Sequence, residues 1–154
     1  MRPKTLAGVA DLTARGEAFD ASLAEFLDEF YATPQAHALL ATPRLLAPGL
    51  GEAGRVADAY LAATAEHLAT VRRFPVPAWT ASDARALHRP WFASPLAALR
   101  TVLILESPVA FRSRNLFISE RRADPRLRRR PPTLCPDIRR RRPRVLPVNG
   151  SGRT

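Results

Sequence analysis

Apolar side chains recur at helical spacing in two stretches of the chain before residue 75. The first stretch places five large side chains on one face, namely Phe19, Leu23, Phe26, Leu27 and Phe30. It predicts a helix over residues 20–32 with Asp20 as its N-cap. The second stretch predicts a helix over residues 52–72, with buried positions at Val56, Tyr60, Ala63, Leu68 and Val71. Pro75 and Pro77 end that helix, because proline has no backbone N–H to donate.

Three pairs of a hydroxyl residue and a proline predict further helix starts. A Ser or Thr can cap a helix N-terminus, and the proline that follows it suits the first helical position. The pairs are Thr33-Pro34, Ser94-Pro95 and Ser107-Pro108. They predict a short helix ending near Leu40, a helix over residues 95–105 and a short helix after Pro108. Residues 80–83 read Thr-Ala-Ser-Asp, which resembles a capping box and predicts a short helix to about His88.

The most apolar run of the chain, residues 101–105, is expected to be buried in the core. It is too short to cross a bilayer, which needs about 20 apolar residues. The apolar stretch near the N-terminus is interrupted by Asp11 before a signal segment is complete. The single cysteine, Cys135, excludes an internal disulfide, as in proteins of reducing compartments. We therefore expect a cytoplasmic protein without membrane association.

No segment alternates apolar and polar residues with the two-residue period of a half-buried strand. We therefore predict an all-α fold, a small irregular helical bundle of five or six helices. The helical domain is expected to cover residues 1–119. Residues 120–154 are rich in Arg and Pro and poor in aliphatic residues, so we predict that they form a disordered basic tail.

Positive charge is concentrated near the C-terminus. Residues 1–111 carry 10 Lys+Arg and 11 Asp+Glu, whereas residues 112–154 carry 14 and 3. Clustered arginines bind phosphate backbones without sequence specificity. The candidate nucleic-acid-binding residues are Arg128, Arg129, Arg130, Arg139, Arg140, Arg141 and Arg142. Two other interpretations stay open: a solvated appendage, or the product of a shifted GC-rich reading frame, which tends to encode Arg and Pro.

One glycine motif matches a phosphate-binding pattern. Residues 49–54 read Gly-Leu-Gly-Glu-Ala-Gly, the spacing of a dinucleotide-binding loop. Such a loop needs a strand before it and a second parallel strand after its helix, and the prolines around this motif argue against both. We interpret it as a glycine-rich loop that leads into a helix. The histidines His37, His67 and His88 fall on three different predicted helices. We therefore predict no catalytic residue, metal site or cofactor.

Three aromatic residues flank the short helix predicted after residue 80. They are Trp79, Trp91 and Phe92. Aromatic side chains supply much of the buried area in small cores, and Trp91 is expected to be buried where two helices meet. The same residue types are enriched at protein interfaces, so these three are also the candidate partner-binding residues.

Several segments of the chain resemble a family of short, uncharacterised bacterial helical proteins. The segments are Ala78–Thr80, Arg89–Pro95 and Leu105–Ser119, together with the helix that contains Phe26–Phe30. The resemblance covers residues 18–119. Members of that family are often encoded beside nucleotidyltransferase-like reading frames, in an arrangement similar to toxin–antitoxin pairs. The resemblance implies a protein partner and no active-site residues, and this chain departs from the family pattern from Glu120 onward.

These observations favour a non-enzymatic protein-interaction module with an antitoxin-like role. The absence of catalytic patterns, the aromatic residues between positions 79 and 92 and the family resemblance all support this expectation. The alternative is a non-specific nucleic-acid-binding protein that acts through its Arg-rich tail.

Overall fold

The computed structural model describes residues 2–120, so the predicted tail lies outside the described residues. The described part contains six α-helices, three 3-10 helices and two strands of two residues each. In chain order the elements are α1 Leu6–Ala14, α2 Phe19–Ala32, α3 His37–Leu40, α4 Ala47–Arg72, η1 Ala78–Ala81, η2 Asp83–Arg85, β1 Trp91–Phe92, η3 Ala97–Leu99, α5 Arg100–Glu106, α6 Val109–Arg112 and β2 Leu116–Phe117. The helical content confirms the predicted all-α class.

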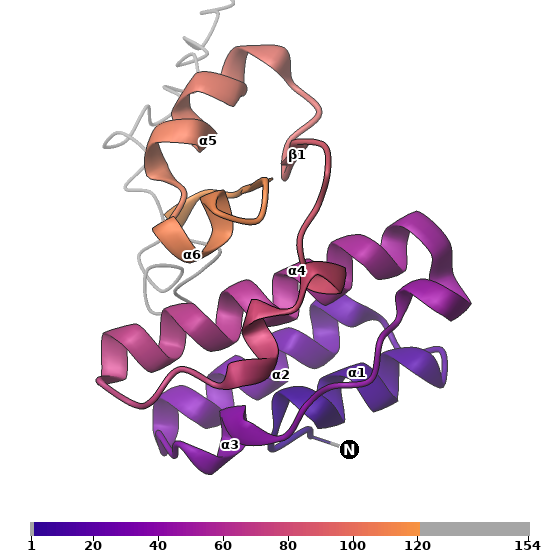
Figure 1. Cartoon of the computed structure of the whole chain (residues 1–154), viewed down its shortest axis with the longest axis vertical. Helices are drawn as coiled ribbons and strands as arrows, with labels where there is room; N and C mark the ends of the chain where they lie inside the picture. Colours follow the sequence, from indigo (N-terminus) through magenta and orange to yellow (C-terminus); the bar gives the residue numbers. More distant parts are fainter. Residues whose placement is uncertain (1, 121–154) are drawn as a thin grey trace, which may run out of the picture.

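Helix α4 lies between two layers of the molecule (Figure 1). On one side, α1, α2 and α3 pack against it and form the larger core, which consists of Leu6, Val9, Ala10, Leu23, Phe26, Leu27, Phe30, Ala38, Leu39, Leu46, Ala57, Leu61, Ala65, Leu68 and Ala69. On the other side, the segments after residue 86 pack against α4 and form with it a smaller core of Ala59, Ala63, Leu87, Ala110, Phe111, Leu116 and Ile118. Residues 61–65 are all buried, because α4 has neighbours on both faces.

The two long helices occur where the apolar spacing predicts them. All four of the Leu and Phe positions of α2 after its first residue are buried, while Phe19 is half-buried. Asp20 is not the N-cap: Ala18 holds that position without a side-chain cap, and Asp20 lies in the first turn, where its charge suits the helix dipole. The apolar spacing of α4 also predicts that Val71 is buried, but its side chain is 57% exposed.

Helix α1 has no counterpart in the sequence prediction. Its N-cap is Thr5, whose hydroxyl accepts a hydrogen bond from the N–H of Gly8 at 3.0 Å. The helix buries Leu6 and Val9 against α2, so it completes the larger core. Polar residues interrupt the apolar spacing of α1, so the sequence pattern does not predict this short helix. Tertiary packing stabilises it.

The predicted capping box at Thr80 is wrong. The Thr80 hydroxyl is buried and donates to the carbonyl of Pro77 at 2.8 Å, and the segment forms η1 and η2 in place of an α-helix. No pattern in the sequence signals the two short strands, β1 and β2, which pair in parallel register within this all-α fold. Two residues per strand are too few to give a recognisable alternation.

None of the helices in residues 2–120 combines the length and the apolar character that a membrane span requires.

Candidate functional site

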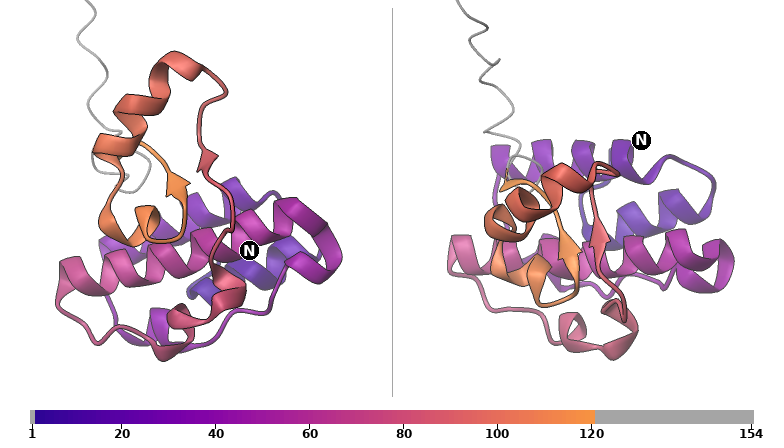
Figure 2. Two further views of the ribbon diagram at one scale, coloured as in Figure 1. Left: turned by 45° about the horizontal axis from the view of Figure 1, so that its top comes forward. Right: turned by 90° about the horizontal axis from the view of Figure 1, so that it is seen from above.

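Residues 94–109, which we call the arm, project from the helical layers of the molecule. The arm contains η3 and α5, and it rises beyond α4 on the side opposite α1 and α2 (Figures 1 and 2). The sequence predicted one continuous helix over residues 95–105. The structure instead has an extended residue at Leu96, then η3, and only then α5.

Backbone pairing holds the first end of the arm. The N–H of Trp91 donates to the carbonyl of Asn115 at 2.8 Å, and the N–H of Ala93 donates to the carbonyl of Phe117 at 2.9 Å. Asn115 adopts a left-handed φ of 59°, which Asn tolerates better than most residues. Its side-chain amide donates to the carbonyl of Leu87. These contacts attach β1 to the segment that follows α6.

A single hydroxyl holds the other end of the arm. The Ser107 hydroxyl accepts from the N–H of Ile118 at 2.6 Å and donates to the carbonyl of Ile118 at 2.9 Å. Ser107 was predicted to cap the helix after it, but α6 has no side-chain cap. The hydroxyl therefore closes the arm onto Ile118, the residue after β2, and does not start a helix.

The arm exposes most of its large apolar side chains. Eleven large hydrophobic residues are exposed in the described part of the chain, and six of them lie between positions 96 and 109. These six are Leu96, Leu99, Val102, Ile104, Leu105 and Val109. Leu105 is 74% exposed, and Leu103 is the one buried residue of α5. The expectation that residues 101–105 are buried is therefore wrong, and this apolar surface is the strongest candidate for an interface.

An aromatic stack lies at the base of the arm. The rings of Phe92 and Phe117 are stacked with their centroids 5.0 Å apart and their planes at 21°. The guanidinium of Arg100 lies over the Phe92 ring, 5.2 Å from its centroid. This cation–π contact holds the side chain of Arg100 over the stacked rings. Of the three predicted partner-binding aromatics, Phe92 is the one whose ring contacts a residue of the arm.

Trp79 lies elsewhere and has a structural role. Its indole N–H donates to the carbonyl of Leu39 at 3.0 Å, which ties η1 to α3. The guanidinium of Arg85 lies over its ring at 4.7 Å. Trp79 is half-buried against the larger core, so its position does not support the predicted role in partner binding.

Trp91 is half-buried in β1, not buried between two helices as expected. It lies beside the smaller core and lines an apolar pocket of about 370 Å³. Phe19, Leu50, Val56 and Tyr60 are among the other residues of this pocket, which therefore lies where α2, α4 and β1 meet. The three predicted aromatics thus occupy three separate places.

Arg114 is one of the arginines counted above in the basic C-terminal part of the chain, but it has a structural role. Its guanidinium is buried, donating to the carbonyl of Ala110 at 2.7 Å and to the carbonyl of Thr80 at 2.8 Å. It also forms an ion pair with Glu66 at 2.6 Å. Arg114 therefore joins α4, η1 and α6 as part of the folded body.

The glycine motif at residues 49–54 serves the fold. No strand precedes it, and Gly51 kinks α4 with φ 59° and ψ −129°, a conformation that favours glycine. A Cβ at Gly54 would lie 2.4 Å from the carbonyl oxygen of Leu46. These two glycines allow the chain to turn tightly over the start of α4.

The buried carboxylate of Asp58 completes this turn. It accepts from the N–H of Leu46 at 2.9 Å and from the N–H of Ala47 at 3.0 Å. The guanidinium of Arg85 lies 4.0 Å away and donates to the carbonyl of Pro43. Burial lowers the pKa of Arg85 below its ordinary value, and the charge of Asp58 opposes that change. No local pattern in the sequence signals this pair.

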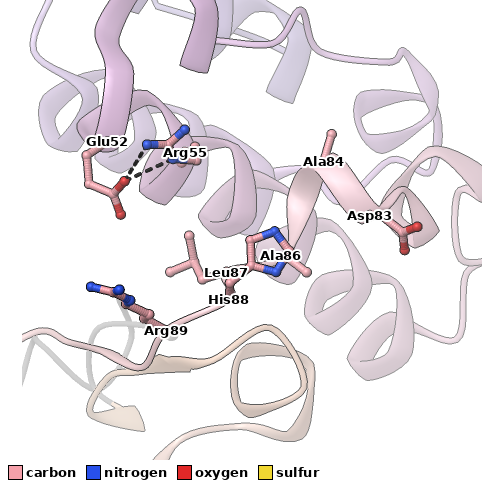
Figure 3. Close-up of a pocket in the computed structure, with 8 residues that line it drawn as sticks. All are labelled: Glu52, Arg55, Asp83, Ala84, Ala86, Leu87, His88 and Arg89. Atoms are coloured by element: carbon pink, nitrogen blue, oxygen red, sulfur yellow. Dashed lines mark hydrogen bonds and ion pairs between the residues drawn. The ribbon is translucent and has the colours of Figure 1, made fainter.

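A charged pocket of about 430 Å³ lies between α4 and the segment after η2 (Figure 3). Glu52 and Arg55 form an exposed ion pair at 2.7 Å on one side, with Asp83 on the other and His88 between them. Arg89 also lines the pocket. All five side chains are exposed and their charges nearly balance, which is typical of a solvated surface.

The remaining candidates do not form a site in the described residues. His67 contacts the ring of Phe111, whereas His37 and His88 are exposed on other elements. Residues 2–120 contain no group of three or more potential metal ligands. The seven predicted nucleic-acid-binding arginines, between positions 128 and 142, lie outside the described residues.

Comparisons of this chain with protein-family models, with curated proteins and with solved structures gave no match.

Proposed function

We propose that this protein is a protein-interaction module and that the exposed apolar surface of the arm is its binding surface. The observation that supports the proposal is the clustering of six of the eleven exposed large hydrophobic residues in the arm. Apolar patches of this kind on small proteins often mark protein-binding sites. The contacts of Ser107 and β1 support the same function, because they hold the arm in one position before a partner binds.

Substitution on the arm tests this function. We expect the full chain to capture a defined set of proteins from a lysate of the cells that encode it. The variant Leu105→Glu should no longer capture these proteins, because burying a charged side chain in an apolar interface is unfavourable unless an opposite charge pairs with it. The matched control is Val71→Glu, which introduces the same charge at another exposed aliphatic position. Equal capture by the Leu105 variant and the wild type would contradict the proposal.

An antitoxin-like role is the more specific form of the proposal. It rests on the resemblance of residues 18–119 to proteins encoded beside nucleotidyltransferase-like reading frames. Co-expression of the full chain with a neighbouring nucleotidyltransferase-like protein should then relieve growth inhibition by that protein. Continued growth arrest would exclude this role while leaving protein binding by the arm open. The chain's single cysteine supports a reducing compartment such as the cytoplasm.

A second candidate function rests on charge. Residues 2–120 carry 12 Lys+Arg and 12 Asp+Glu, whereas residues 121–154 carry 12 and 2. We propose, as the alternative, that these C-terminal arginines bind nucleic acid without sequence specificity. Replacing residues 139–142 by serine in the full chain should then weaken binding to duplex DNA and reduce its salt dependence. Unchanged binding or no binding by the wild type would exclude this alternative.

A further inference from the structure

Three aromatic side chains line the apolar pocket of about 370 Å³ beside β1. They are Phe19 at the start of α2, Tyr60 in α4 and Trp91 in β1. All three are half-buried, so part of each side chain stays accessible. The rings of Phe19 and Tyr60 have centroids 5.9 Å apart and planes at 81°. Two aromatic walls of the pocket therefore meet nearly at right angles, and Trp91 adds a third from another element.

Helix α4 contributes an apolar stripe to the same pocket. Ala53, Val56 and Tyr60 line it at intervals of three and four residues, which places them on one face of the helix. Leu50 also lines the pocket and is 46% exposed. None of the described residues that line this pocket is positively charged. A ligand in the pocket therefore meets hydrocarbon and aromatic surface on most sides.

The one charged side chain that lines the pocket is acidic. Asp20 is exposed in the first turn of α2, and its carboxylate has no hydrogen bond or ion pair with any of residues 2–120. The other polar side chains of the lining are the hydroxyls of Thr13 and Tyr60. The Thr13 hydroxyl donates to the carbonyl of Val9 at 2.9 Å. An unpaired negative charge thus lies beside three aromatic rings.

Other aromatic rings of this protein already carry a cation. Arg85 lies over the ring of Trp79, and Arg100 lies over the ring of Phe92. Within residues 2–120, Trp91 has no such cation over its indole. Trp91 is therefore available to a cation that comes from outside the described part of the chain.

The combination of rings and carboxylate matches the chemistry that recognises a methylated ammonium group. The face of an aromatic ring attracts a cation, and a cage of such rings is the usual protein site for a quaternary ammonium. A primary ammonium has three N–H donors that need acceptors, whereas a quaternary ammonium has none. A largely apolar pocket with one carboxylate therefore suits the quaternary group better. The volume is sufficient for a small ligand, since such sites begin at about 300 Å³.

We infer that this pocket binds a free small molecule that carries a quaternary ammonium group. The rings of Phe19, Tyr60 and Trp91 surround the methylated cation, and Asp20 balances its charge. The pocket contains no residue of the arm, so this inference goes beyond the proposed function and does not depend on it.

A nuclear magnetic resonance titration of the full chain with choline tests the site. The indole N–H resonance of Trp91 should shift while that of Trp79 stays in place. We expect a dissociation constant of roughly 0.1–5 mM, because the ligand is small. The matched probe is 3,3-dimethylbutan-1-ol, which has the shape of choline without its charge and should bind at least about tenfold more weakly. Equal binding of the two probes, or no shift up to about 20 mM choline, would overturn the inference.

The carboxylate is tested by a substitution that leaves the core intact. Asp20→Asn should weaken choline binding by about three- to tenfold at low salt, because it removes the opposite charge. The matched control is Asp28→Asn, since Asp28 is also exposed on α2 but does not line the pocket, and it should bind choline as the wild type does. Equal affinity of the two variants would contradict the proposed site.

The indole is tested in the same way. Trp91→Leu should abolish choline binding, whereas Phe92→Leu should retain it, because Phe92 stacks on Phe117 outside the pocket. Circular dichroism checks that both variants are folded, and the Asp20 pair decides the outcome if either is not. A folded Trp91 variant with wild-type affinity for choline would overturn the inference.

Vesicles distinguish a free molecule from a lipid headgroup with the same cation. The full chain should stay in solution when vesicles of phosphatidylcholine are sedimented. Co-sedimentation that choline competes away and that Asp20→Asn weakens would overturn the assignment to a free small molecule, because the pocket would then recognise a membrane surface.

Discussion

The hydroxyl of Ser107 makes two hydrogen bonds to the backbone of one residue, Ile118, accepting from its N–H and donating to its carbonyl. Both groups are buried, and Ile118 belongs to the smaller core. The arm is thereby closed onto the body at a point 11 residues further along the chain. One small side chain thus holds the second end of the arm against the body.

Replacing this hydroxyl should destabilise the protein. Ser107→Ala leaves the N–H and the carbonyl of Ile118 buried without partners, and we expect a loss of about 1–3 kcal/mol in the free energy of unfolding. Denaturant titration measures the change. The control is Ser113→Ala, because Ser113 is exposed and its hydroxyl donates to the carbonyl of Ala110 and accepts from Arg114. A Ser107 variant as stable as the Ser113 variant would contradict the closing role.

Arg114 should resist conservative replacement. Its guanidinium reaches Glu66 and the carbonyls of Thr80 and Ala110 at once, which the single ammonium of lysine cannot reproduce. We expect Arg114→Lys to lower the free energy of unfolding by about 1–3 kcal/mol. Arg112→Lys, on the exposed neighbour, should change it by less than about 0.5 kcal/mol. Equal effects at the two positions would show that Arg114 does not anchor α6.

Asp58 and Arg85 should behave as a coupled pair. Asp58→Asn removes the charge near Arg85 and replaces the carboxylate that accepts from two backbone N–H groups. We therefore expect the free energy of unfolding to fall by about 3–5 kcal/mol. Arg85→Met should also destabilise the protein. Each single variant leaves the other charged group without its partner. The double variant should therefore lower the free energy of unfolding by less than the sum of the two single changes. Strict additivity in this double-mutant cycle would show that the two side chains act independently.

Gly54 should tolerate no side chain. Gly54→Ala places a Cβ against the backbone of Leu46, which cannot move without opening the turn. We therefore expect the free energy of unfolding to fall by about 1–3 kcal/mol. Gly49→Ala is the matched control, since a Cβ at Gly49 meets no atom within 4 Å. The midpoint of thermal unfolding should fall for the first variant and hold or rise for the second. The reverse order would show that close packing does not explain Gly54.

Local sequence determined the parts of this protein that depend on neighbours three or four residues away. The spacing of Phe26 and Phe30 was enough to place α2, and the prolines after Arg72 were enough to end α4. The same reasoning identified residues 49–54 as a glycine-rich turn that leads into a helix, and the structure confirms it, since no strand lies between residue 2 and this motif.

Only the tertiary structure decided which apolar and polar groups find partners. Trp79 bonds to a carbonyl 40 residues away and Arg114 to one 34 residues away, and no local pattern carries such information. Periodicity likewise shows that Val71 and Leu105 are apolar but not whether another element covers them. Burial depends on how the chain folds back on itself. For that reason the sequence predicted a buried segment at residues 101–105, where the fold presents an exposed arm.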